Sequence, residues 1–163
     1  MEYVLLAPGP SMNLDLAEAL RGERVGVISN VFELAPWADF LAANDRAWWR
    51  AYPEAMNFAG RRFSSSEMQG VERCRPGNTQ WASGVLALQV AVNVGASRIR
   101  LYGFDMHGSH FFGEYTNGLL NTKPFRRAIH LQQFRDWARA NPNVEVVNCT
   151  PGSALDCFPM EAV

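Results

Sequence analysis

The sequence predicts an α/β fold, a Rossmann-like three-layer sandwich with a mostly parallel sheet, formed as one domain over residues 1–163. The unbroken apolar run over residues 3–7 is typical of a strand that is buried on both faces of a parallel sheet, and residues 24–29 predict a second buried strand. Residues 14–20 between them have a helical pattern, so the order strand, helix, strand indicates a βαβ unit. A chain of 163 residues suits one hydrophobic core, and no repeat or linker divides it.

The rest of the chain continues this alternation. Further strands are expected over residues 40–43, 61–64, 71–73, 98–102 and 144–148. Helices are expected over residues 46–52 and 81–94 and from Pro124 onward, with a short helical turn near Ala154. The helix after Pro124 has an apolar stripe that is predicted to be buried: Phe125, Ile129, Phe134, Trp137 and Ala138.

Composition excludes several classes of function. The net charge of −1 gives no basic excess, so no binding to nucleic acid is expected. No apolar stretch reaches the ~20 residues of a membrane span, and no basic segment precedes the first strand as in a signal peptide. The three cysteines, Cys74, Cys149 and Cys157, form neither a disulfide framework nor a zinc pattern, so a reducing cytoplasm is expected.

Candidate ligand-binding residues follow the predicted strands, because ligands of open parallel sheets gather beyond the carboxyl ends of the strands. They are Gly9, Pro10, Ser11, Asn30, Asn44, Asp45, Asp105 and Ser153. Ser83 and Gly84 join them, because a helix start offers free N–H groups and a positive dipole end to a phosphate.

Each candidate also has a purely structural interpretation. Gly9 between two prolines can be a rigid turn, and the asparagines and Asp105 can cap helices or turns. Ser83 and Gly84 can serve helix packing. The chain contains neither a Gly-x-Gly-x-x-Gly motif nor a Walker lysine motif.

The long polar and aromatic loop over residues 107–123 is the segment most suited to catalysis. His110 is the predicted general acid or base, because histidine titrates near neutral pH; the alternative is a solvated loop histidine. Asp105, His107 and His110 raise the question of a metal, but spacing within a loop is undemanding and no metal is expected. His130 is predicted to be structural.

Three blocks resemble bacterial family-42 sialyltransferases. Leu6-Ala-Pro-Gly-Pro-Ser11 is similar to their Gly-Asn-Gly-Pro-Ser loop, and Ala82-Ser-Gly-Val85 to their Thr-Ser-Gly helix start. Asn148-Cys-Thr-Pro-Gly-Ser-Ala-Leu155 is similar to their Cys-Pro-x-Ser-x-Leu segment. The block Leu34-Ala-Pro-Trp-Ala-Asp39 resembles short phage and prophage proteins of unassigned function even more closely.

The sialyltransferase resemblance implies a metal-free site for a cytidine nucleotide sugar. In it, Gly9, Pro10 and Ser11 would line the phosphate, and Asn30 would hold the sugar or the phosphate. Asn44 or Asp45 would face the donor sugar. The remaining contacts would come from Ser83, Gly84, Asp105 and Ser153. The family's catalytic histidine falls near Leu120 or Asn121, where this chain has no histidine.

The first hypothesis is therefore a phage-type glycosyltransferase that takes a sugar from a nucleotide-sugar donor, CMP-linked as in the family, and passes it to an unknown acceptor. His110 or Asp45 would deprotonate the acceptor hydroxyl, and no other cofactor is expected. The alternative is a non-catalytic nucleotide-binding or virion-associated protein. A diphosphokinase is less favoured, because no acidic metal-binding cluster is evident. A homo-oligomer is possible from the sequence. If the protein is encoded by a phage, it is expected to act in the host cytoplasm.

Overall fold

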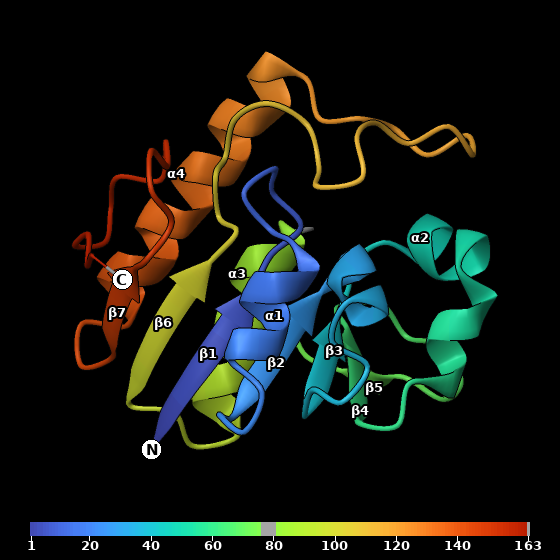
Figure 1. Ribbon diagram of the computed structural model, residues 1–163, viewed down its shortest axis with the longest axis horizontal. Coiled ribbons are helices and arrows are strands. Elements are labelled where there is room, and N and C mark those ends of the chain that lie inside the picture. The colour runs from blue at the N-terminus through green and yellow to red at the C-terminus, as the bar shows by residue number, and fades with distance from the viewer. Residues whose placement is uncertain (76–80, 163) are drawn as a thin grey trace.

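The computed structural model describes residues 1–75 and 81–162, and Figure 1 shows its ribbon. Within these ranges seven strands form one sheet in which every neighbouring pair is parallel, in the order β5-β4-β3-β2-β1-β6-β7. The strands are β1 (Glu2–Leu6), β2 (Val25–Ile28), β3 (Phe40–Ala42), β4 (Arg61–Ser64), β5 (Glu72–Arg73), β6 (Arg98–Tyr102) and β7 (Glu145–Asn148). The predicted α/β fold is thus confirmed.

Helices cover both faces of this sheet. The α-helices are α1 (Leu14–Ala19), α2 (Arg46–Ala51), α3 (Ser83–Asn93) and α4 (Pro124–Ala140), and 3-10 helices span Ser29–Glu33 and Pro53–Asn57. In Figure 1, α1 lies in front of the sheet and α3 behind it. None of the helices in the described part of the chain is both long and apolar enough to cross a bilayer.

Two hydrophobic clusters form the core, one on each face of the sheet. Tyr3 and Leu5 of β1 belong to the cluster that includes α3 and the second half of α4. Val4 and Leu6 belong to the cluster beneath α1 and α2. Successive strand residues point to opposite faces, so a strand covered on both sides needs apolar side chains throughout, as the unbroken runs predicted.

The strand order reverses beside β1. The chain lays β2 to β5 down on one side of β1 and then returns to place β6 on the other side. The loops after β1 and β6 meet there: the Gly9 amide donates to the Gly103 carbonyl at 2.9 Å. A Cβ at Gly9 would lie 2.3 Å from that carbonyl oxygen, so the close approach requires glycine.

The amino ends of the central strands carry paired charges. Arg98 of β6 forms ion pairs with Glu2, with Glu145 at 3.3 Å and with Glu161 at 2.9 Å. Arg100 contacts Glu2 at 2.9 Å and Glu23 at 3.5 Å. The parallel register sets Glu2 beside Arg98, which makes this network a consequence of strand pairing.

Two predictions of local structure were wrong. Phe125 and Ile129 are 67% and 47% exposed, because the first half of α4 extends past the sheet, whereas Phe134 and Trp137 are buried as predicted (Figure 1). No helical turn forms at Ala154, which lies in a bend and whose amide donates to the Asp105 carbonyl at 2.9 Å, so that this segment is held against the chain after β6.

Candidate functional site

A cavity of about 1010 Å³ lies at the carboxyl ends of the strands. It is lined by the chain after β1, β2, β3 and β6, by the starts of α2, α3 and α4, and by the loop over residues 107–123. Figure 1 shows this loop running beyond the strand tips from β6 toward α2 and back to α4. The cavity therefore sits where the strand order reverses, the usual ligand site of open α/β sheets.

The structure brings six of the predicted site residues to the cavity wall: Gly9, Asn44, Asp45, Ser83, Gly84 and His110. The other five, which are Pro10, Ser11, Asn30, Asp105 and Ser153, are not part of that wall. Pro10 is exposed, and the hydrogen bonds of the other four show what they hold in place.

Ser11 and Asp105 bind each other. The Ser11 hydroxyl donates to Asp105 Oδ1 at 2.7 Å, and the Ser11 amide donates to the same oxygen at 3.3 Å. Asp105 is buried, and the Ser153 hydroxyl donates to the neighbouring Phe104 carbonyl. These contacts join the first loop, the end of β6 and the segment after β7 to one another.

Asn30 positions two aromatic side chains of the cavity wall. Its buried Oδ1 accepts from Trp48 Nε1 at 2.9 Å and from the Tyr115 hydroxyl at 3.1 Å. Its Nδ2 donates to Glu33 Oε1 at 3.3 Å. Burial raises the pKa of Tyr115, with further contributions from Tyr52 and Asp45, so the phenol keeps the proton that it donates to Asn30.

Asn44 and Ser83 connect β3 with the start of α3. The Asn44 amide donates to Ser83 Oγ at 3.0 Å, and Asn44 Oδ1 accepts from the Ser65 hydroxyl. Asn44 lines the cavity, and its Nδ2, which carries two N–H donors, has no partner within the described ranges. At Gly84 a Cβ would lie 2.8 Å from the Phe134 ring, so close helix packing is one reason for this glycine.

The start of α3 faces the cavity with uncapped amides. Ala82 is the N-cap residue and offers no side-chain acceptor to the first turn, while Trp81, Ala82 and Ser83 line the cavity. The first N–H groups of a helix lack intrahelical partners and carry a partial positive charge. This wall is suited to an anionic ligand group.

His110 has the geometry of a general base. Its Nδ1 lies 3.0 Å from the Gly113 carbonyl, which can only accept, so Nδ1 carries the proton and Nε2 is free to take one. Burial lowers the pKa of His110; the Gly113 carbonyl and Glu114 oppose this, whereas Arg127 adds to it. The ring stacks on Phe112 at 4.7 Å, which fixes its orientation.

All three histidines of the chain line this one cavity. His107 Nε2 contacts the Gly152 carbonyl at 3.1 Å. Burial lowers the pKa of His130, and the positive charges of Arg126 and Arg127 lower it further. His130 was predicted to be structural because it lies beside the apolar stripe of its helix. The structure places it on the half of α4 that extends past the sheet, at the cavity wall.

Most of the charged residues of the cavity wall are positive. It carries one carboxylate, Asp45, and four cations: Arg46, Lys123, Arg126 and Arg127. None of the four forms an ion pair among residues 1–75 and 81–162. Sequence reasoning missed these cations, although Lys123-Pro-Phe-Arg-Arg127 at the end of the long loop was a signal for them.

Strained backbone also occurs at the cavity. Ser29 and Met106, which have φ values of 49° and 57°, are the non-glycine residues with positive φ among the described ones. Both line the cavity, directly after β2 and four residues after β6. Such conformations cost free energy and persist where surrounding contacts impose them, often at ligand sites.

The histidines do not form a metal centre with Asp105. Asp105 accepts from Ser11, and both histidines of the loop face backbone carbonyls. Across residues 1–75 and 81–162, no three His, Cys, Asp or Glu side chains gather as ligands of a metal ion would.

No protein-family model and no curated protein matches the chain. Among solved structures, the sialyltransferase CST-II in complex with a trisaccharide acceptor and CMP aligns at TM-score 0.59 and 14% identity, over 100% of this chain and 86% of that one. The sialyltransferase CstII from Campylobacter jejuni, in complex with the substrate analogue cytidine-5′-monophosphate, aligns at TM-score 0.51 and 13% identity, over 97% and 83%.

A probable thiamine pyrophosphokinase from Staphylococcus saprophyticus subsp. saprophyticus aligns at TM-score 0.49 and 14% identity, over 90% of this chain. This chain spans 63% of the length of that protein. At such identities the similarity to the sialyltransferases concerns the fold alone. The protein thus has a parallel three-layer α/β fold similar to that of the CstII sialyltransferases.

Proposed function

We propose that the protein transfers a sugar from a CMP-linked donor to the hydroxyl of an acceptor. The observation that carries this proposal is the cavity at the strand reversal. Its wall holds four cations that form no ion pair among the described residues, the uncapped starts of α2, α3 and α4, and His110 with a free Nε2. A nucleotide sugar has the matching parts, namely an anionic phosphate, polar rings and a reactive anomeric carbon.

The charges suggest how such a donor is held. The amides at the start of α3 and the guanidinium groups of Arg126 and Arg127 supply positive charge to the cavity wall. Charge-assisted hydrogen bonds to phosphate are stronger than neutral ones and gain further strength where water is excluded. The same groups stabilise the negative charge that develops on the departing nucleotide.

In the proposed step, His110 Nε2 takes the proton of the acceptor hydroxyl. The hydroxyl oxygen forms a bond to the anomeric carbon while the bond from that carbon to the phosphate oxygen breaks, and the nucleotide leaves with the electron pair. The lowered pKa keeps His110 neutral, and therefore basic, near pH 7. Asp45, whose carboxylate also lines the cavity, is the alternative base.

The solved structures of similar fold support the choice of a cytidine nucleotide. One of them was crystallised with CMP and a trisaccharide acceptor, and another with cytidine-5′-monophosphate. In this proposal the full chain acts as one domain, without metal, in the cytoplasm of a cell that carries the gene on a phage or prophage.

A non-catalytic nucleotide-binding role, as in a virion-associated protein, is the second candidate. Leu120 and Asn121 line the cavity where the resembling family has its histidine, so a chain that lost turnover could keep the binding site.

Nucleotide binding is tested by thermal shift with CMP, UMP and GMP. A ligand at 100 times its Kd stabilises the folded state by about 2.7 kcal/mol. We expect CMP to raise the Tm most, without any need for Mg²⁺. No shift with any nucleotide would remove both candidate functions, and a shift that requires Mg²⁺ would favour phosphoryl transfer.

Catalysis is tested by replacing each candidate base. His110→Gln should reduce hydrolysis of CMP-sialic acid by about 10²- to 10⁴-fold and leave the CMP thermal shift intact, since a base is needed only for the chemical step. If Asp45→Asn has this effect instead, Asp45 is the base. If the unmodified chain binds CMP and does not turn over the donor, the non-catalytic role replaces the first proposal.

A further inference from the structure

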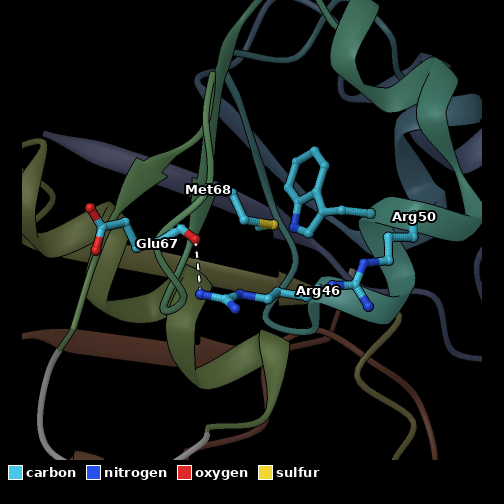
Figure 2. A pocket seen from close by; sticks show the side chains of 5 residues that line it. Arg46, Arg50, Glu67 and Met68 are labelled. Atoms are coloured by element: carbon cyan, nitrogen blue, oxygen red, sulfur yellow. Dashed lines mark hydrogen bonds between the residues drawn. The ribbon is translucent and has the colours of Figure 1, made fainter.

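A second, smaller cavity of about 310 Å³ lies beside the first and is lined by Arg46, Trp49, Arg50, Glu67 and Met68 (Figure 2). Arg46 belongs to the walls of both cavities. The position follows from the fold, because α2 begins immediately after Asn44 and Asp45 at the end of β3. A molecule in the large cavity could therefore extend past Arg46 into the small one.

Arg46 and Arg50 bring two positive charges into this cavity without a counter-ion. Arg46 donates to the Glu67 backbone carbonyl at 3.0 Å, and Arg50 has no hydrogen-bond or ion-pair partner within the described ranges. Figure 2 shows the Glu67 carboxylate pointing away from both guanidinium groups. It lies 3.9 Å from Arg73 instead.

This arrangement is unfavourable for the helix that carries it. The two arginines are four residues apart on α2, where like charges repel, and no carboxylate in the described part of the chain pairs with them. An anion from outside the chain would relieve the repulsion.

The remaining walls are suited to a sugar ring. Trp49 is buried and is held by a hydrogen bond from Nε1 to the Ala43 carbonyl at 2.9 Å. Met68, half-buried, adds a flexible apolar wall. An apolar wall beside guanidinium groups fits a ring that carries one acidic substituent, and 310 Å³ lies at the small end of ligand sites.

We propose that this second cavity is an acceptor subsite that binds an acidic sugar through Arg46 and Arg50. The inference rests on the proposed function, since it names the class of acceptor for the transfer in the large cavity. The shared chemistry is a carboxylate or phosphate group on a sugar ring. Arg50 is the specificity-determining residue, because it contacts the small cavity and lies outside the wall of the large one.

The test is a titration of the whole protein followed through the Nε–H resonances of arginine side chains by NMR. The carboxylate arm compares sialyllactose with lactose, and the phosphate arm compares glucose 1-phosphate with glucose. We expect a saturable shift of the Arg50 resonance with at least one acidic probe at about 0.15 M salt, where loose ion pairing is screened. The neutral partners should leave it unchanged.

Arg50→Gln identifies the resonance and serves as the variant, with Arg24→Gln, an exposed arginine outside both cavities, as the matched control. Arg50→Gln should weaken binding of the acidic probe about tenfold, and Arg24→Gln should not change it. Equal responses to acidic and neutral sugars, or no saturable response to either acid, would overturn the proposal.

The titration needs neither donor nor turnover, so its failure is distinct from failure of the proposed function. Where transfer is observed, Arg50→Gln should raise the KM for sialyllactose about tenfold relative to the KM for lactose. An equal rise in KM for both acceptors would mean that Arg50 does not read the acidic group.

Discussion

The two ends of the parallel sheet treat charge in opposite ways. At the amino ends, Arg98 and Arg100 each contact two or more carboxylates across neighbouring strands. At the carboxyl ends, four cations surround a cavity and form no ion pair among the described residues. The same residue types thus hold strands together at one end and stay available to a ligand at the other.

The difference follows from what each end contributes. Strand pairing sets Glu2 beside Arg98, so charges at the amino ends are satisfied once the sheet forms. The loops at the carboxyl ends leave their N–H groups and cations directed at an open space. Changes at the first end should therefore alter stability, and changes at the second should alter binding.

Removing the cations of α4 should have the largest effect. The double variant Arg126→Gln, Arg127→Gln loses charge-assisted bonds to phosphate and should weaken CMP binding about 100-fold, with little change in Tm without nucleotide. Isothermal titration calorimetry measures this. Arg139→Gln near the end of the same helix is the control, since it is 77% exposed and distant from the cavity. A lower Tm with unchanged CMP affinity would show that these cations stabilise the fold and do not bind the nucleotide.

Breaking the paired end should have a smaller effect of the other kind. Glu2→Gln removes the carboxylate shared by Arg98 and Arg100 and should lower the free energy of unfolding by about 1 kcal/mol, measured by urea denaturation. CMP affinity should not change. Glu18→Gln, which breaks an exposed pair within one helix end, should cost less. If both variants unfold alike, the network is no stronger than an isolated surface pair.

The smallest expected effect is a loss of stability in mild acid. Burial lowers the pKa of His110 and of His130 in the folded protein below the ordinary value of 6.5. As the pH falls below about 6.5, the unfolded chain binds protons that the folded chain does not, so the free energy of unfolding should fall. His130→Asn should reduce this slope in urea titrations between about pH 7.5 and 5.5. An unchanged slope would show that His130 is not desolvated.

The ion pairs at the amino ends of the strands make stability depend on pH in a different, more acidic range. Hydrogen bonding to Arg98 lowers the pKa of Glu2 below 4.5 in the folded state. The stabilisation is complete above the unfolded value and is lost as the pH falls through the lower folded value.

The sheet could be predicted because its chemistry is local. A strand covered on both faces must be apolar throughout, and β1 and β2 showed this directly. The buried half of α4 was also predictable, whereas its first half was not. Helical periodicity marks which residues share a face, and it does not tell where the sheet beneath that face ends. Phe125 and Ile129 belong to the correct stripe and still face outward.

The site was predicted in part for a related reason. Parallel strands aim their carboxyl ends in one direction, so Gly9, Asn44 and Asp45 could be assigned to one edge. Which side chains face the cavity depends on packing that sequence spacing does not encode. Ser11 binds Asp105 and Asn30 binds Trp48, while Arg126 and Arg127, which resemble a solvated helix face, line the wall.

The two hydrogen bonds accepted by Asn30 have an optical consequence. They place the Trp48 indole at the cavity wall and connect it through one oxygen to Tyr115 of the long loop. Any movement of that loop changes the polarity around an emitting ring. Trp48 is thus an intrinsic fluorophore at the wall of the cavity, and a change in tryptophan emission on addition of CMP would report occupancy without a label.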